Sequence, residues 1–269
     1  PEITVKELLN HTAGIPNPIP LDWIHSESEH KIFDRNTFFN TIFKKNRKTK
    51  SEPNEKFEYS NLGYVILGQL IEKVSGKKYE EYITENIIRK LPVNPDELTF
   101  DIRSDETHAT GYHKLCSFSY LFLGLFLDKS KFMGEATGKW RSFKKFYVNG
   151  ASYGGLIGTP KAFTAYIQEL LKTDSSLIAD EYSQLLFQES LTNNGKKTGM
   201  CLSWFSGELD GNRYFAHAGG GGGYYCEIRL YPEIKKGSVV FFNRTGMSDE
   251  RFLDSTDKYL INNLFPTGK

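Results

Sequence analysis

Residues 59–79 read YSNLGYVILGQLIEKVSGKKY, and the spacing of their apolar residues decides the helical part of the fold. Within 61–74 the apolar residues recur every three or four positions, which predicts an amphipathic helix. Its apolar face comprises Leu62, Val65, Ile66, Leu70 and Val74. Gly76 is a favourable stop because glycine accepts the left-handed conformation that ends many helices. A second amphipathic helix is expected over 79–91, closed by Pro92.

Further helices are expected on both sides of this pair. The string TVKE at 4–7 has the spacing of a capping box, which predicts a short helix. One more helix is expected at about 36–44. Thr159-Pro160 combines an N-cap residue with proline at the first helical position, which predicts a helix start. The inner face of that helix is expected to comprise Phe163, Ile167, Leu170 and Leu171.

After residue 195 the pattern changes from helical to strand spacing. Strands joined by turns are expected at 198–209, 212–217, 224–231 and 238–243. The turns are placed at Asp210-Gly211 and Lys236-Gly237, and a last helix is placed at about 249–264. Helices followed by an antiparallel sheet with a helix packed on it indicate the α+β class.

Composition bounds the possible functions. The chain has 269 residues, with 34 Lys and Arg against 33 Asp and Glu, and this length allows a sizeable core. The near-neutral balance argues against nucleic acid as a partner, because phosphate binding needs a concentrated basic surface. The basic run at 44–50 is interpreted as a solvated loop. The 3 cysteines and 6 histidines have no spacing typical of a zinc site or a disulfide framework, so no metal is expected.

The most apolar stretch of the chain is LCSFSYLFLGLFL at 115–127. It is too short for a helix that spans a bilayer, which needs about 20 residues. The stretch is therefore interpreted as a buried helix or as a hydrophobic flap over a pocket.

Two short motifs have residue types that suit a catalytic site. Tyr59-Ser60-Asn61 lies where a loop enters a predicted helix, so that its side chains can project into a cleft. Tyr147-Val148-Asn149 has the same spacing without that context. His217-Ala218-Gly219-Gly220 ends a predicted strand, where glycines let a substrate backbone lie against the strand edge and free N–H groups for an oxyanion. The alternatives are a structural turn and a phosphate loop, and the strand that follows disfavours the phosphate loop.

In their order along the chain, these segments resemble the class C β-lactamase-like family of penicillin-binding serine hydrolases. The resemblance rests on ITVKELLNHTAGI at 3–15, YSNLGYVILGQLIEKVSGKKY at 59–79, GGLIGTPKAF at 154–163, and FAHAGGGGGY at 215–224 followed by YPE at 231–233. It implies one β-lactamase-like domain over 1–269. A helical lobe is expected at roughly 17–150, and the antiparallel sheet with the final helix at roughly 195–265.

The resemblance also implies a mechanism and a set of site residues. The expected chemistry is acylation and deacylation of a serine by a small amide, ester, D-amino peptide or β-lactam substrate, without a cofactor. Tyr59 corresponds to the family's general base, and Asn61 to the asparagine that contacts the substrate amide and a catalytic lysine. His217 and Gly219 fall on the strand that edges the site, and the N–H of Gly220 would be an oxyanion donor. An extracytoplasmic location is implied, whereas nothing indicates an oligomeric state.

A tyrosine has an ordinary pKa of about 10, so it can accept a proton only where nearby cations lower that value. A lysine and a histidine beside Tyr59 are expected to do so. The family's nucleophile is the serine of a Ser-x-x-Lys motif that precedes the HTAG block. All such strings in this chain follow that block, at Ser28, Ser75, Ser142 and Ser255. Lys197-Thr198-Gly199 spells another family motif but falls in the strand before the motif strand.

We therefore expect this chain to be the C-terminal part of a longer protein. The remaining part would supply the nucleophile and further strands, which predicts a bare sheet edge and a groove beside Tyr59 sized for a helix.

Three functions stay open at this point. The first is a serine hydrolase whose nucleophile lies on a segment outside this chain. The second is a non-catalytic family member that binds a peptide or a cell-wall-like ligand. The third is an interaction protein that uses the apolar 115–127 stretch. Covalent labelling by a fluorescent penicillin or a fluorophosphonate separates the first from the other two.

Overall fold

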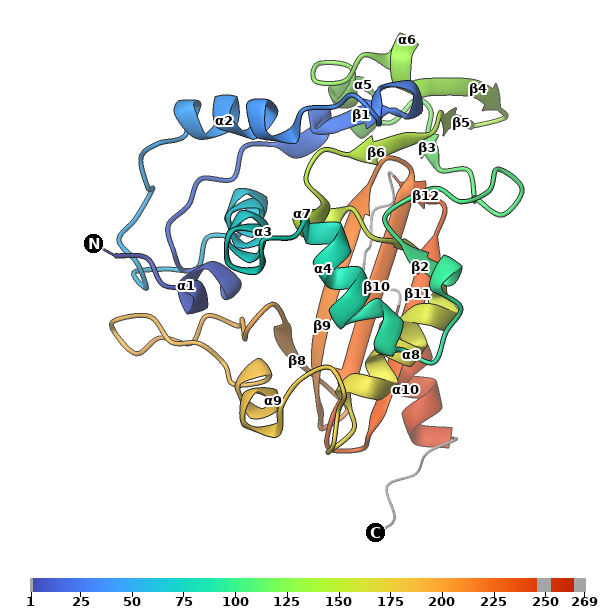
Figure 1. Cartoon of the computed structure of the whole chain (residues 1–269). Coiled ribbons are helices and arrows are strands. Elements are labelled where there is room, and N and C mark those ends of the chain that lie inside the picture. Colours follow the sequence, from blue (N-terminus) through green and yellow to red (C-terminus); the bar gives the residue numbers. More distant parts are fainter. Residues whose placement is uncertain (1, 246–252, 264–269) are drawn as a thin grey trace.

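A four-stranded antiparallel sheet, in the order β11-β10-β9-β8, forms the centre of the molecule (Figure 1). The structure is a computed structural model that describes residues 2–245 and 253–263. The strands are β8 (Phe205–Leu209), β9 (Asn212–Gly221), β10 (Tyr224–Tyr231) and β11 (Lys236–Phe242). The α+β class and the expected antiparallel sheet are confirmed.

The turns of this sheet differ in part from the predicted ones. Asp210 and Gly211 both have positive φ, 49° and 77°, and join β8 to β9 as predicted. The turn predicted at Lys236-Gly237 is wrong, because these residues already pair with β10. The chain reverses before them, where the Lys235 N–H donates to the Pro232 carbonyl at 3.2 Å. Proline lacks the N–H that a strand ladder needs, which ends β10 at that point.

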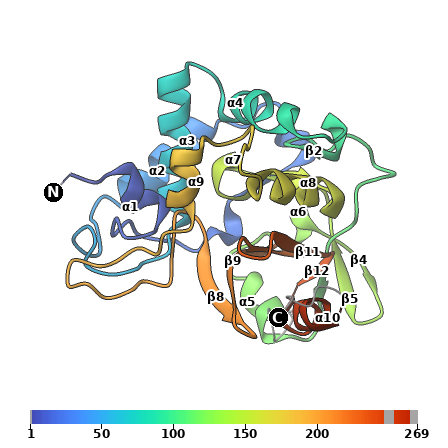
Figure 2. The same ribbon diagram turned by 90° about the horizontal axis from the view of Figure 1, so that it is seen from below.

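Helix α8 (Pro160–Leu170) lies on one face of the sheet and α10 (Leu253–Asn263) on the other (Figure 2). Helix α8 packs Ile167 and Leu170 into a core that includes Phe215 and Leu230. The helix starts as predicted, with the Thr159 hydroxyl accepting the Ala162 N–H at 3.1 Å. The start predicted for the last helix, α10, near residue 249, lies outside the described residues.

The buried carboxylate of Asp257 anchors α10 to the sheet. It accepts hydrogen bonds from the Tyr231 hydroxyl at 2.7 Å and the Ser238 hydroxyl at 2.9 Å. Burial raises the pKa of Asp257 against the opposing effect of these bonds.

A helical layer built around α3 stands beside the sheet. Its helices are α1 (Val5–Leu9), α2 (Arg35–Lys45), α3 (Asn61–Ser75), α4 (Tyr79–Asn86) and α7 (Ala151–Gly154). As predicted, Gly76 ends α3 with a left-handed φ of 70°. The predicted inner face of α3 is correct only at its start, because Val74 is 79% exposed and Leu67 is buried instead. Leu67 packs against Leu8 of α1, a neighbour that helical periodicity alone does not specify.

Smaller strands and turns complete the fold. The strands are β1 (Ile24–Ser26), β2 (Leu98–Thr99), β3 (Tyr112–Lys114), β4 (Met133–Thr137), β5 (Trp140–Phe143), β6 (Phe146–Val148), β7 (Ile157–Gly158) and β12 (Arg244–Thr245). The short helices are α5 (Phe118–Leu123), α6 (Lys129–Phe132) and α9 (Asp180–Leu186), with single 3-10 turns η1 (Pro20–Asp22), η2 (Glu27–Glu29), η3 (Ile88–Lys90) and η4 (Pro95–Glu97). Strands thus occur within 17–150, where the sequence predicts a helical lobe. The helix predicted over 79–91 is divided into α4 and η3.

The apolar 115–127 stretch is neither a buried helix nor a cover over a described pocket. Leu123 and Leu127 are buried, at 7% and 4% exposed, but Phe118, Leu121 and Leu125 are 83%, 71% and 76% exposed. Apolar composition predicts burial, and only the inward residues of this stretch obey that rule. Within residues 2–245 and 253–263, no helix is long and apolar enough to cross a membrane.

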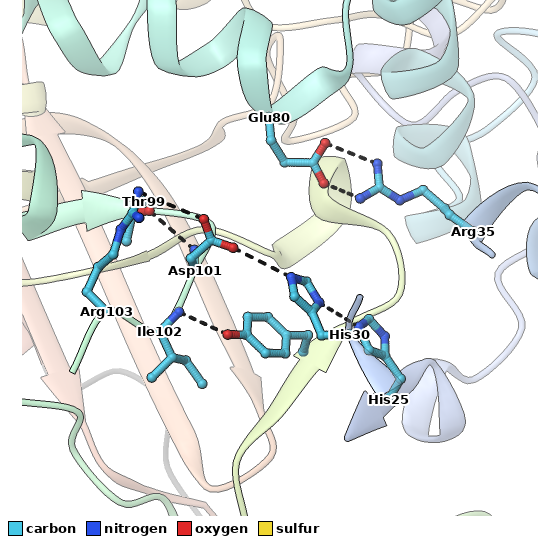
Figure 3. A network of polar contacts seen from close by, with 9 residues as sticks. His25, His30, Arg35, Glu80, Thr99, Asp101, Ile102 and Arg103 are labelled. Atoms are coloured by element: carbon cyan, nitrogen blue, oxygen red, sulfur yellow. Dashed lines mark hydrogen bonds and ion pairs between the residues drawn. The ribbon is translucent and has the colours of Figure 1, made fainter. Parts of the chain in front are cut away.

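A row of polar side chains links β1 and the end of β6 to the segment that follows β2 (Figure 3). Buried His25 is hydrogen-bonded to Asn149 at 2.8 Å and to His30 at 2.9 Å. His30 in turn lies 3.5 Å from the carboxylate of Asp101. Asn149, the last residue of the second Tyr-x-Asn string, is therefore used in a structural contact with His25. Nearby, Arg35 of α2 forms an ion pair with Glu80 of α4.

Candidate active site

The turn at residues 11–14 is held against the segment that leads to Tyr59. The carbonyls of His11, Thr12 and Gly14 accept N–H bonds from residues 58, 54 and 50, each at 2.8 Å. Gly14 has a φ of +67°, and a Cβ there would lie 2.3 Å from the Ser51 carbonyl oxygen. Only glycine fits this close approach, so this position of the HTAG block has a structural reason.

The residue after Tyr59 secures the entry into α3. The Ser60 N–H donates to His11 Nδ1 at 3.1 Å, and the Ser60 hydroxyl caps α3 by accepting the Gly63 N–H at 3.1 Å. Asn61 is the first residue of α3, and its N–H donates to Asn17 Oδ1 at 3.0 Å. The backbone on both sides of the Tyr59 ring is therefore well anchored.

A loop from the far end of the chain also packs over this turn. The Asn10 amide donates to the Ser190 hydroxyl at 3.0 Å. The Leu9 carbonyl accepts the Ser203 N–H at 3.1 Å, and the Asn54 carbonyl accepts the Asn193 N–H at 2.7 Å. The loop at 190–203 is thus joined by hydrogen bonds to the segments on both sides of the turn at residues 11–14.

Aromatic rings bring Tyr59 and His217 together. The Tyr59 ring lies 4.2 Å from the His11 ring and 6.3 Å from the His217 ring, measured between centroids. Phe205, the first residue of β8, stacks at 6.4 Å on Tyr59 and lies 5.8 Å from His217. Tyr59 and His217 therefore lie close together. That Asn61 shares one cleft with them, and the catalytic roles of all three residues, stay predictions.

The strand that presents His217 has an unpaired edge beside it. β8 pairs with β9 only as far as Ala216. From His217 to Gly221 the described structure pairs β9 on its β10 side alone. A Cβ at Gly219 would meet only Cys226 Sγ, at 3.4 Å, and a Cβ at Gly221 would meet nothing within 4 Å. The glycines lie within the strand, which runs longer than predicted, and they keep its outer edge uncovered.

The electrostatics of the site contradict one expectation. Burial raises the pKa of Tyr59, with no lowering contribution from a cation. Burial also lowers the pKa of His217, against a hydrogen bond to the backbone of Ala218. The expectation that a histidine lowers the pKa of Tyr59 is wrong, because a desolvated imidazole is neutral near pH 7.

His11 is a site residue that the sequence analysis did not single out. Its ring is buried, at 3% exposed, and its pKa falls to about 4 through burial and, second, through His217. Nδ1 accepts the Ser60 N–H, while buried Nε2 has no partner among the described residues. The HTAG block was the available signal, but a lone histidine in a turn gives no indication of contact with Tyr59.

Other candidate strings lie elsewhere in the fold. Lys197 forms an ion pair with Glu189 and lies before β8, outside the strands. The Ser-x-x-Lys serines lie in η2, at the end of α3, in β5 and in α10. Among the residues that the structure describes, no group of three or more His, Cys, Asp or Glu could hold a metal ion.

Comparison with known proteins identifies the family. The profile of the Beta-lactamase family matches residues 1–261. This chain belongs to the beta-lactamase family. Among curated relatives, Penicillin-binding protein 4* of Bacillus subtilis (strain 168) is 25% identical over 253 residues, covering 90% of this chain and 51% of that protein. Protein flp of Staphylococcus aureus (strain MRSA252) is 24% identical over 265 residues, covering 97% and 47%. This beta-lactamase-family chain spans about half the length of these relatives.

Solved structures share the fold of this beta-lactamase-family chain. The octameric penicillin-binding protein homologue from Pyrococcus abyssi has a TM-score of 0.71 and 24% identity, over 97% of this chain and 56% of that one. The D-amino acid amidase from Ochrobactrum anthropi SV3, complexed with L-phenylalanine amide, has a TM-score of 0.68 and 17% identity, over 95% and 70%. These similarities confirm the β-lactamase and penicillin-binding-protein type of fold.

Proposed function

We propose that this chain provides the Tyr59 side of a serine hydrolase that acts through an acyl-enzyme. The substrate class is a small amide, ester, D-amino peptide or β-lactam. The observation that carries the proposal is the placement of Tyr59 6.3 Å from His217, next to the uncovered edge of β9. Membership of the beta-lactamase family supports it, and the fold likeness to a D-amino acid amidase supports amides among the substrates.

The nucleophile and a cation come, in this proposal, from a segment outside the chain. A serine hydroxyl is a weak nucleophile until a neighbour accepts its proton, and Tyr59 with its raised pKa is a poor acceptor alone. A lysine brought beside Tyr59 would lower that pKa by favouring the phenolate. The sheet has room for further strands, because β11 pairs only with β10 in the described structure.

The expected groove beside Tyr59 stays a prediction. One described hollow is lined by residues of α3, α4 and α7, among them Gly68, Tyr79 and Ser152. Another lies between η2 and Lys131, Lys144 and Lys145. Neither is lined by Tyr59 or His217.

The substrate would lie along β9 in this proposal. An extended acyl chain can add to an uncovered strand edge through backbone hydrogen bonds. Gly219 leaves space for it, the Gly220 N–H would donate to the oxyanion, and Asn61 would contact the substrate amide. His217, as a neutral imidazole, would lie beside the leaving group of the substrate.

Fluorophosphonate labelling of the complete protein that contains this chain tests the proposal. Peptide mass spectrometry should find the label on a serine outside residues 1–269, and Tyr59→Phe should slow the labelling. A label on a serine within the chain would refute the assignment of the nucleophile.

A second candidate function is ligand binding without acylation. The raised pKa of Tyr59 favours it, because a phenol that keeps its proton is a poor general base. Calorimetry would then detect binding of a D-amino peptide by the complete protein, which would remain unlabelled by the fluorophosphonate.

A further inference from the structure

The apolar 117–127 segment stands out from the surface as a defined feature, which we call the apolar knob. It has no charged residue. Its outward side chains are large and apolar, with exposed fractions from 37% to 83%: Phe118, Leu121, Phe122, Leu125 and Phe126. Leu123 and Leu127 point the other way, into a core with Phe132, Met133 and Phe143. Apolar residues therefore occupy both sides of this segment, and the outer side is left to solvent.

The apolar knob has a definite shape. The Ser117 hydroxyl caps α5 by accepting the Tyr120 N–H at 3.1 Å. The rings of Phe118 and Phe122 lie 6.4 Å apart, and those of Phe122 and Phe126 lie 5.0 Å apart. The exposed surface is thus a contiguous aromatic and aliphatic patch on an ordered support. Patches of this kind mark sites of interaction with a protein or a membrane.

Basic residues lie next to Tyr120 and to the start of the apolar knob. Lys129 Nζ lies 3.9 Å over the Tyr120 ring, and Arg141 hydrogen-bonds with the Tyr120 hydroxyl at 3.5 Å. The Lys139 carbonyl accepts the Leu115 N–H at 2.8 Å, and the Lys114 carbonyl accepts the Ser117 hydroxyl at 2.9 Å. The cationic groups of Lys129 and Arg141 therefore border the uncharged apolar surface, and the exposed residues Lys114 and Lys139 adjoin it through their backbone.

The segment 112–148 around the apolar knob is positively charged, whereas the whole chain is nearly neutral. Residues 112–148 contain seven basic residues, Lys114, Lys129, Lys131, Lys139, Arg141, Lys144 and Lys145, against two acidic ones, Asp128 and Glu135. Lys131 and Lys145 form ion pairs with Glu29 and Asp105 from outside the segment. Even without those two, cations exceed carboxylates here, whereas the whole chain has a net charge of only +1.

We propose that the apolar knob docks on the surface of an anionic phospholipid bilayer. Leu121, Leu125 and Phe118 would enter the boundary between headgroups and acyl chains, and the lysines at the base would face the negative headgroups. This combination of an apolar face and flanking cations is that of segments that lie in a membrane interface without spanning it. Charge complementarity selects this occupant over a second copy, because two copies would bring their basic borders together.

Co-sedimentation of the complete protein that contains this chain with vesicles tests this docking. Binding is expected to vesicles of phosphatidylcholine with phosphatidylglycerol, to be weaker on phosphatidylcholine alone, and to fall as salt is raised. The double variant Leu121→Asp, Leu125→Asp should bind at least about tenfold more weakly, because charges would enter the apolar boundary. Lys114→Glu with Lys139→Glu should remove the preference for the anionic lipid.

The matched control is Val74→Asp. This residue is as exposed as the knob residues, at 79%, but lies at the end of α3 in the helical layer, so vesicle binding should be unchanged. Circular dichroism verifies that each variant is folded. Equal binding of the knob variant and the original chain, or no binding to either vesicle, would overturn the proposal. Dimerisation that the knob variant abolishes, without vesicle binding, would assign this surface to a second copy. Neither readout depends on hydrolase activity.

Discussion

His11 makes the stability of the fold depend on pH in a way that the structure predicts. The ring is buried, and its pKa is lowered from 6.5 to about 4. Between these values the unfolded chain binds a proton that the folded chain does not bind. The stability that neutral His11 provides is therefore fully present above pH 6.5 and is lost as the pH falls toward 4.

The magnitude follows from the size of this shift. Each unit of pKa difference corresponds to about 1.4 kcal/mol, and integration between roughly pH 7 and pH 5 gives a loss of about 2 kcal/mol from this group. Buried carboxylates with a raised pKa, such as Asp257, also contribute to the pH dependence in that window, but they are present in both proteins compared below. The pKa of Glu29 and of Glu169 is lowered from 4.5 to about 2 by hydrogen bonds and lysine partners, so their contributions are lost only at more acidic pH.

Urea denaturation at both pH values, in the original chain and in His11→Asn, measures the effect. Asparagine cannot take up the proton, and it tolerates the positive φ of 58° at this position. Buried Trp23 provides a fluorescence signal for unfolding. The variant is expected to be less stable at pH 7 but to lose about 2 kcal/mol less on acidification. The other histidines are present in both proteins, so an unchanged pH dependence in the variant would refute the reasoning.

Three further predictions concern single positions. In the complete protein, Tyr59→Phe should reduce turnover by roughly 10²- to 10⁴-fold without unfolding the protein, and near-normal turnover would assign the general base to another residue. The control Tyr64→Phe loses hydrogen bonds to Leu9 and Ser203. It should cost about 1 kcal/mol of stability and retain activity. Gly14→Ala should lower the free energy of unfolding by about 2 kcal/mol or more, seen as a lower urea midpoint, and a neutral effect would contradict the close contact with Ser51. Steady-state kinetics should favour small esters or D-amino peptides over cephalosporins, because neutral His217 offers no fixed positive charge to a β-lactam carboxylate; a hundredfold preference for cephalosporins would oppose this.

Local rules explain what could be predicted from the sequence. The capping box at Thr4, the helix start at Thr159 and the stop at Gly76 depend on residues within one turn, and all three are confirmed. The four strands occur where the sequence predicts them, since strand alternation and turn residues are local signals, but the first begins at Phe205 and not at residue 198.

Features that depend on distant neighbours could not be predicted in this way. The outward side of the apolar knob has the same composition as a core segment, so only the tertiary packing shows that Leu121 is exposed. The proximity of Tyr59 and His217 followed from a family resemblance and not from any local pattern. The pKa values of both groups depend on burial by rings such as Phe205 and His11, which lie far apart in the sequence.

The hydrogen bonds between the beginning of the chain and the 190–203 loop set an order of events during synthesis. The residues that cap helix α3, Ser60 and Gly76, lie next to it in the sequence, so the helix can begin to form while the ribosome is still adding residues. The contacts that Leu9, Asn10 and Asn54 make with Ser203, Ser190 and Asn193 have to wait until the 190–203 loop emerges. Such long sequence separations slow folding. The surroundings of Tyr59 are therefore among the last parts to mature, and a ribosome-stalled chain that ends before residue 190 should expose this ring to solvent.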